Sequence, residues 1–101
     1  MDRKARLLVV EDDADLAQGL SVWLRAKGFE VLIAQDGLQA LTAVRKEHPD
    51  LVLLDLGLPG GDGYTVLERM RGMVDGASVP VIVLRARDPV VNRDRAAERT
   101  S

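Results

Sequence analysis

Residues 49–63 decide the fold of this chain, and they read Pro-Asp-Leu-Val-Leu-Leu-Asp-Leu-Gly-Leu-Pro-Gly-Gly-Asp-Gly. A short, continuous apolar run, 51–54, ends at an acid, Asp55. Such a run is typical of a strand that is buried on both faces of a parallel sheet. The glycines and the proline that follow Asp55 predict a loop at the carboxyl end of that strand.

Three similar apolar runs, at residues 7–10, 29–34 and 79–84, lie to either side of this stretch. Apolar residues recur at helical spacing between the runs, and a short fourth helix is expected over 90–99. Strands that alternate with helices predict one α/β domain, over residues 1–101, with a parallel sheet and right-handed crossovers. The positions expected on the buried faces of the first three helices are Leu16, Leu20, Trp23 and Leu24; Leu38, Leu41 and Val44; and Val66, Leu67, Met70 and Met73.

The composition limits the classes of function. Apolar residues make up 47% of the 101 residues and charged residues 30%, as in ordinary soluble domains. The net charge of −2 gives no reason to expect nucleic acid or a membrane surface as a direct partner. Cysteine is absent, which excludes disulfides and thiolate chemistry, and no apolar run approaches the roughly 20 residues of a membrane helix. We therefore expect a cytoplasmic protein.

Acidic residues follow two of the predicted strands. Glu11 and Asp12 come after the first strand, and Asp55 ends the third. The ligand crevice of an open α/β sheet lies beyond the carboxyl ends of its strands, so these carboxylates are expected to converge there. Carboxylates that converge repel one another unless a cation lies among them, and Mg²⁺ prefers such oxygen ligands. We therefore expect Asp55 to act as a nucleophile toward a phosphoryl group, with Glu11, Asp12 and the carbonyl oxygen of Gly57 as metal ligands.

Acids after a strand have a simpler explanation as well, because an acid at that position often only caps the next helix. Asp13 is the residue for which capping alone is an adequate account. Capping does not explain why a second buried strand also ends in an acid, Asp55.

The same segments resemble the receiver domains of bacterial response regulators. Residues 7–13 resemble the first strand and acidic pair of that family, 49–63 its phosphorylation loop and 80–84 its fourth strand. The resemblance extends from about Arg6 to about Ala97. It implies a flavodoxin-like, doubly wound parallel sheet, in which this chain would supply the strand order 2-1-3-4.

The resemblance also implies roles for individual residues. Asp55 would accept a phosphoryl group from a histidine kinase or a phosphotransfer protein, and Mg²⁺ would be required. Glu11 and Asp12 match the acidic pair, and Gly57 matches the backbone metal ligand. Pro59 and Gly63 would shape the loop, Gly63 by adopting backbone angles that other residues resist.

Arg85 departs from the family pattern, because it stands where a threonine or serine is usual. Its guanidinium could bind the phosphoryl group, pair with Asp55 beforehand, or simply point into solvent. The chain also ends before the family's fifth strand, its lysine and its fifth helix. We therefore expect an incomplete domain, either a fragment or a chain that self-associates through the fourth strand or the helix after it.

Three functions remain open at this point. The first is a phosphorylated signalling switch, and the second is a degenerate receiver that binds partners without being phosphorylated. The third, a small hydrolase or phosphatase, ranks last because the sequence offers no general acid or base beyond the acidic cluster. His48 is expected on the surface without a catalytic role, and Trp23 in the core.

Overall fold

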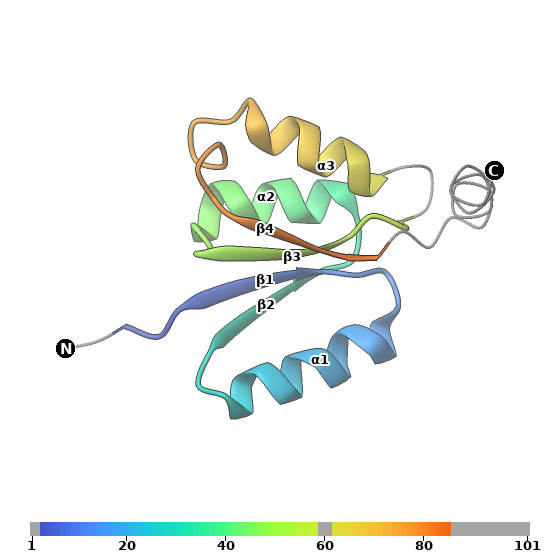
Figure 1. Cartoon of the computed structure of the whole chain (residues 1–101), viewed down its shortest axis with the longest axis vertical. Coiled ribbons are helices and arrows are strands. Elements are labelled where there is room, and N and C mark those ends of the chain that lie inside the picture. The colour runs from blue at the N-terminus through green and yellow to red at the C-terminus, as the bar shows by residue number, and fades with distance from the viewer. Residues whose placement is uncertain (1–2, 59–61, 86–101) are drawn as a thin grey trace, which may run out of the picture.

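The computed structural model describes residues 3–58 and 62–85. Over these residues the strands form one parallel sheet in the order β2-β1-β3-β4, which confirms the expected flavodoxin-like arrangement (Figure 1). The helix expected over 90–99 lies outside the described residues. The elements are β1 (Arg6–Val10), α1 (Ala14–Ala26), β2 (Glu30–Ala34), α2 (Gly37–Glu47), β3 (Leu51–Asp55), α3 (Asp62–Arg71) and β4 (Val81–Arg85).

Helices cover both faces of the sheet, with α1 on one face and α2 and α3 on the other (Figure 1). Alternate residues of each strand therefore enter different cores. In β1, Leu7 and Val9 belong to the cluster under α1, whereas Leu8 and Val10 belong to the larger cluster under α2 and α3. Burial on both faces explains why the strands are continuous apolar runs.

The helix ends follow the signals in the sequence. Asp13 caps α1, because its Oδ1 accepts a hydrogen bond of 3.1 Å from the amide of Leu16. Gly28 follows α1 with φ +100°, a conformation that favours glycine. Asp36 caps α2 in the same way. At the other end of α2, His48 is exposed, as expected, and adopts a left-handed conformation with φ 50°.

Three of the expected core positions are wrong. Leu16 is 41% exposed, Trp23 is 57% exposed and Leu38 is 78% exposed. The reason on α1 is that the helix turns a different side to the sheet, the side that carries Ala17, Ser21 and Leu24. Residues as small as alanine and serine let the helix approach the strands closely, so the larger side chain of Trp23 is left outside the core. The expected positions on α3 are confirmed, with Val66 and Met70 fully buried.

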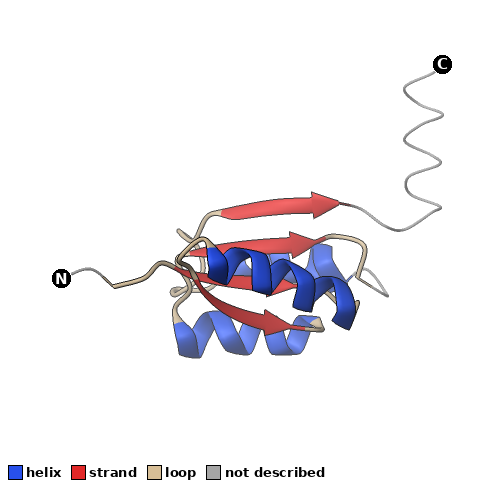
Figure 2. Cartoon of the chain, turned by 90° about the horizontal axis from the view of Figure 1, so that it is seen from below, coloured by secondary structure: helices blue, strands red, loops and turns tan. Residues whose placement is uncertain are grey.

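Strand β4 is the least covered part of the sheet. Ile82, Val83 and Leu84 are 51%, 45% and 39% exposed. Among the described residues no helix lies across this strand, which forms the outer edge of the sheet (Figure 2). No helix in residues 3–58 and 62–85 is long and apolar enough to cross a membrane.

An ionic network closes the amino-terminal end of the sheet. Asp50 accepts hydrogen bonds from both terminal nitrogens of Arg3, each at 3.0 Å, and from the backbone amide of Arg6 at 2.7 Å. The hydrogen bonds from Arg3, with that from the Arg6 amide, lower the pKa of Asp50 from 3.8 to about 2. This end of the sheet is opposite to the end that carries the acidic cluster.

Candidate functional site

Parallel pairing brings the acids of two strands to the same edge of the sheet. β1 lies beside β3, with Val10 directly opposite Leu54. The next residue along each strand is an acid, Glu11 after β1 and Asp55 at the end of β3. The crevice beyond the carboxyl ends of the strands therefore receives carboxylates from both chain segments.

The structure brings Glu11, Asp12 and Asp55 together. Each of the three offers a carboxylate oxygen, and these oxygens all lie within 4.8 Å of one another. Glu11 and Asp55 are buried, at 1% and 0% exposed, and Asp12 is half-buried. Burial strengthens the repulsion between like charges, so this cluster favours a bound cation.

The donor set fits a magnesium ion. Oxygens that bind Mg²⁺ at about 2.0–2.1 Å in an octahedron lie roughly 3–4 Å from one another. The spacing of up to 4.8 Å between the three carboxylate oxygens requires only a small closure, or a water on one ligand position. Residues that would hold the ion are Glu11, Asp12 and Asp55.

Backbone amides hold two of the carboxylates in place. The amide of Gly57 donates a hydrogen bond of 2.8 Å to Oδ1 of Asp55, and the amide of Asp13 donates one of 3.0 Å to Oε2 of Glu11. The sequence predicts a role for the carbonyl of Gly57 only, and the structure adds this role for its amide. An aspartate that bonds the amide two residues later is a common local turn, so the Asp-Leu-Gly spacing at 55–57 carried the signal.

Gly63 supports the site for a reason other than the one expected. Among the described glycines only Gly28 has a positive φ, so Gly63 needs no unusual backbone angle. A β-carbon at Gly63 would instead lie 2.7 Å from the carbonyl oxygen of Asp55. Glycine is therefore required because the start of α3 packs directly on the backbone of the acceptor. Pro59 lies outside the described residues.

Arg85 is the register partner of Asp55 on β4, after an irregularity between Leu54 and Asp55. The backbone of Arg85 thus lies beside the acidic cluster, whereas its side chain lies outside the described part of the structure. Asp13, in contrast, is occupied with capping α1, as the simpler explanation predicted.

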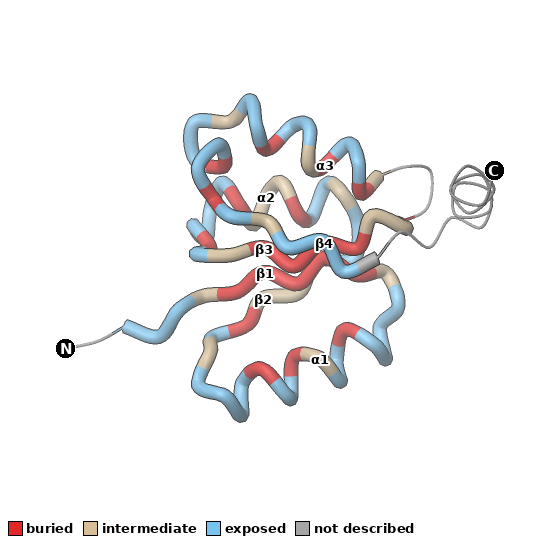
Figure 3. Tube along the Cα trace, in the orientation of Figure 1, coloured by how far each residue is buried: buried red, intermediate tan, exposed pale blue. Residues whose placement is uncertain are grey.

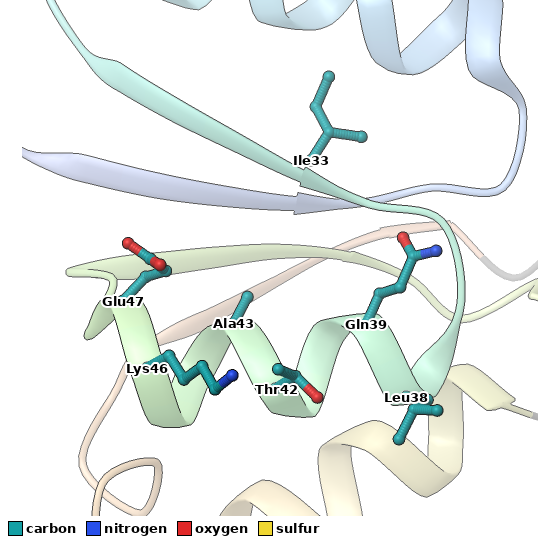
Figure 4. A pocket seen from close by; sticks show the side chains of 7 residues that line it. All are labelled: Ile33, Leu38, Gln39, Thr42, Ala43, Lys46 and Glu47. Atoms are coloured by element: carbon teal, nitrogen blue, oxygen red, sulfur yellow. The ribbon is translucent and has the colours of Figure 1, made fainter.

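A hollow on the surface lies away from the acids. It has a volume of about 460 Å³ and is lined by Ile33 of β2 and by α2 residues such as Ala43 and Glu47 (Figure 4). None of the three clustered acids lines it. The convergence of carboxylates, and not this hollow, therefore marks the candidate site.

The model of the response regulator receiver domain family matches residues 7–100 of the chain. The chain belongs to the response-regulator receiver family. The match covers both acidic segments of the site and the loop between β3 and α3. The receiver fold thus accounts for the position of the cluster at the carboxyl ends of β1 and β3.

Curated relatives of this receiver include mycobacterial regulators. It is 47% identical over 89 residues to the DNA-binding response regulator MtrA of Mycolicibacterium paratuberculosis, covering 88% of this chain and 38% of that protein. It is 43% identical over 88 residues to the transcriptional regulatory protein PrrA of Mycobacterium tuberculosis, covering 87% of this chain and 37% of that protein. The receiver chain therefore spans less than two fifths of the length of these relatives.

Solved receiver structures are similar in fold and sequence. A response regulator of Chloroflexus aurantiacus superposes with a TM-score of 0.78 at 34% identity, over 95% of this chain and 79% of that one. The receiver domain of the sensor histidine kinase PA1611 of Pseudomonas aeruginosa has a TM-score of 0.79 at 30% identity, over 91% of this chain and 75% of that one. The PA1611 receiver has a magnesium ion coordinated in its active-site cleft.

Proposed function

We propose that this receiver accepts a phosphoryl group on Asp55 from a histidine kinase or phosphotransfer protein, and that Mg²⁺ is required. The observation that carries the proposal is the convergence of Glu11, Asp12 and Asp55 within 4.8 Å at the carboxyl end of the sheet. The proposed role of the domain is regulatory, because phosphorylation of Asp55 would change which partners the domain binds. Signalling of this kind would take place in the cytoplasm.

In the proposed reaction a carboxylate oxygen of Asp55 attacks the phosphorus of the donor. An oxygen–phosphorus bond forms, the donor's bond to phosphorus breaks, and its electron pair stays with the leaving histidine nitrogen. A bound Mg²⁺ would offset the negative charge of the transferred group. The amide of Gly57 holds the carboxylate of Asp55 in one orientation through its hydrogen bond to Oδ1. Glu11, Asp12 and Asp55 would hold the cation, with the Gly57 carbonyl as a further proposed ligand.

Arg85 is the residue for which two outcomes are open. Its register position beside Asp55 supports a direct influence on the phosphoryl group. A guanidinium can bind phosphate through two nitrogens, and it can equally neutralise a carboxylate. In the second case the domain would be a degenerate receiver that binds partners without accepting phosphate.

The relatives suggest a wider context. MtrA is a DNA-binding response regulator, and this chain covers 38% of its length. We propose that the receiver serves a transcriptional regulator and does not itself contact DNA, since its net charge is −2.

Intact mass spectrometry after incubation with Mg²⁺ and acetyl phosphate tests the proposal. A gain of one phosphoryl mass is expected, and it should be lost in Asp55→Asn and in the presence of EDTA. An unmodified chain that is folded by circular dichroism would refute phosphorylation. Arg85→Thr then separates the two outcomes, because restored modification would identify Arg85 as the cause of a degenerate site.

A further inference from the structure

The outer side of α1 is exposed along its length (Figure 3) and carries more apolar residues than those of α2 and α3. Opposite the buried Ala17, Ser21 and Leu24, the exposed residues are Asp15 near the start of the helix and then Gly19, Val22, Trp23 and Ala26. The side of α3 away from its buried residues carries Thr65 and Glu68, and α2 exposes Arg45 and Lys46. A helix that is apolar on opposite sides is usually covered on both.

No contact in residues 3–58 and 62–85 explains why position 19 is a glycine. A β-carbon added there would meet nothing within 4 Å, and its φ is not positive. Glycine inside a helix costs about 1 kcal/mol relative to alanine. It leaves a notch on the exposed side of α1, one turn before Trp23, which is 57% exposed.

The two ends of α1 carry opposite charges on exposed side chains. Asp15 lies in the first turn, and Lys27 caps the last turn, with its Nζ 5.2 Å from the centre of the Trp23 ring. Two such helices can be placed antiparallel, with a two-fold axis at the level of position 21. Positions 15 and 27 lie at equal distances on either side of that level, and so do positions 19 and 23. Each Asp15 would therefore meet a Lys27 of the other copy, and each Trp23 would meet a Gly19. A parallel pair would bring like charges together.

We propose that two copies of this chain associate through the outer sides of α1, packed antiparallel about a two-fold axis. Trp23 of each copy fills the notch at Gly19 of the other, and Asp15 pairs with Lys27. The sequence led us to expect self-association at β4 or beyond it. α1 is the better interface because its shape and its charges are both self-complementary.

Light scattering and tryptophan fluorescence on the full chain test this dimer, since Trp23 is its only tryptophan. We expect the mass to double with concentration, and the Trp23 emission to shift to shorter wavelength in parallel as the ring is buried. A chain that stays monomeric with solvent-exposed emission would overturn the proposal. Emission at short wavelength that does not depend on concentration would overturn it too, since the chain itself would then cover Trp23.

Two sets of variants make the test specific. Gly19→Leu should raise the stability of the fold, because the site is open, yet raise the dissociation constant about tenfold or more, because it fills the seat of Trp23. Asp15→Lys and Lys27→Asp should each weaken the dimer, and the double variant should restore it. Val74→Glu, at a position 97% exposed and outside α1, is the matched control and should leave the mass unchanged. Non-specific aggregation would not be weakened by Gly19→Leu, and it would not be restored by exchanging the charges at positions 15 and 27.

Discussion

Gly63 packs directly on the backbone of Leu56, so closely that a β-carbon at Gly63 would lie 2.6 Å from the Cα of Leu56. This contact ties the first turn of α3 to the residue that follows the acceptor, Asp55. Side-chain carbons do not approach backbone atoms to that distance, so any other residue must push the two segments apart. The position of Asp55 relative to α3 thus depends on the absence of a side chain at position 63.

We expect Gly63→Ala to lower the free energy of unfolding by about 1–3 kcal/mol, because the added methyl overpacks rigid backbone atoms. The same variant should slow phosphorylation of Asp55, whose carbonyl oxygen is 2.7 Å from the added carbon. Urea unfolding measures the first effect and mass spectrometry the second. Gly72→Ala is the matched control, and it should change the stability much less, since the nearest atom to an added β-carbon there is 3.7 Å away. Equal effects from the two changes would contradict this account.

Asp50 should make the stability depend on pH in the acid range. Its hydrogen bonds from Arg3 and from the amide of Arg6 lower its pKa from 3.8 to about 2. A carboxyl with a lower pKa in the folded state stabilises the fold fully above 3.8 and loses that contribution as the pH falls toward 2. The midpoint of urea unfolding should therefore fall over this window, and less so in Asp50→Asn. The exposed Asp75, changed to Asn, should keep the wild-type profile.

His48 should gain from replacement by glycine. It ends α2 with φ 50°, where a side chain other than glycine is unfavourable by about 1–2 kcal/mol. Part of this gain is offset by the larger entropy that glycine loses on folding, so His48→Gly should raise the free energy of unfolding by about 1 kcal/mol. His48→Ala, which keeps the β-carbon, should not. Thermal or urea unfolding of His48→Gly and His48→Ala measures both effects. An equal gain in stability in the two variants would show that the backbone conformation at position 48 is not the cause.

Binding of Mg²⁺ at the acidic cluster should be visible without phosphorylation. Asp12 supplies one of the three carboxylate oxygens that lie within 4.8 Å of one another. In wild type, Mg²⁺ should raise the melting temperature by binding only the folded state. Asp12→Asn should weaken that increase, and an unchanged response to Mg²⁺ would show that the ion binds elsewhere.

Much of the fold was predictable because parallel strands have a distinct sequence pattern. The runs at 7–10 and 51–54 have the pattern typical of strands buried on both faces, and they lie within β1 and β3. Caps were predictable for the same local reason, as Asp13 shows. Trp23 could not be placed, because the side of α1 that meets the sheet depends on how closely Ala17 and Ser21 let the helix approach.

The sequence by itself determined that acids follow two buried strands, because strand, turn and cap signals are local. Only the tertiary structure decided that Glu11, Asp12 and Asp55 lie within 4.8 Å of one another, since that depends on β1 and β3 being neighbours. The tertiary structure likewise decided that the amide of Gly57 donates a hydrogen bond to Asp55. It also decided that position 63 has no room for a side chain. Distances between segments far apart in the chain follow from packing, which no local pattern records.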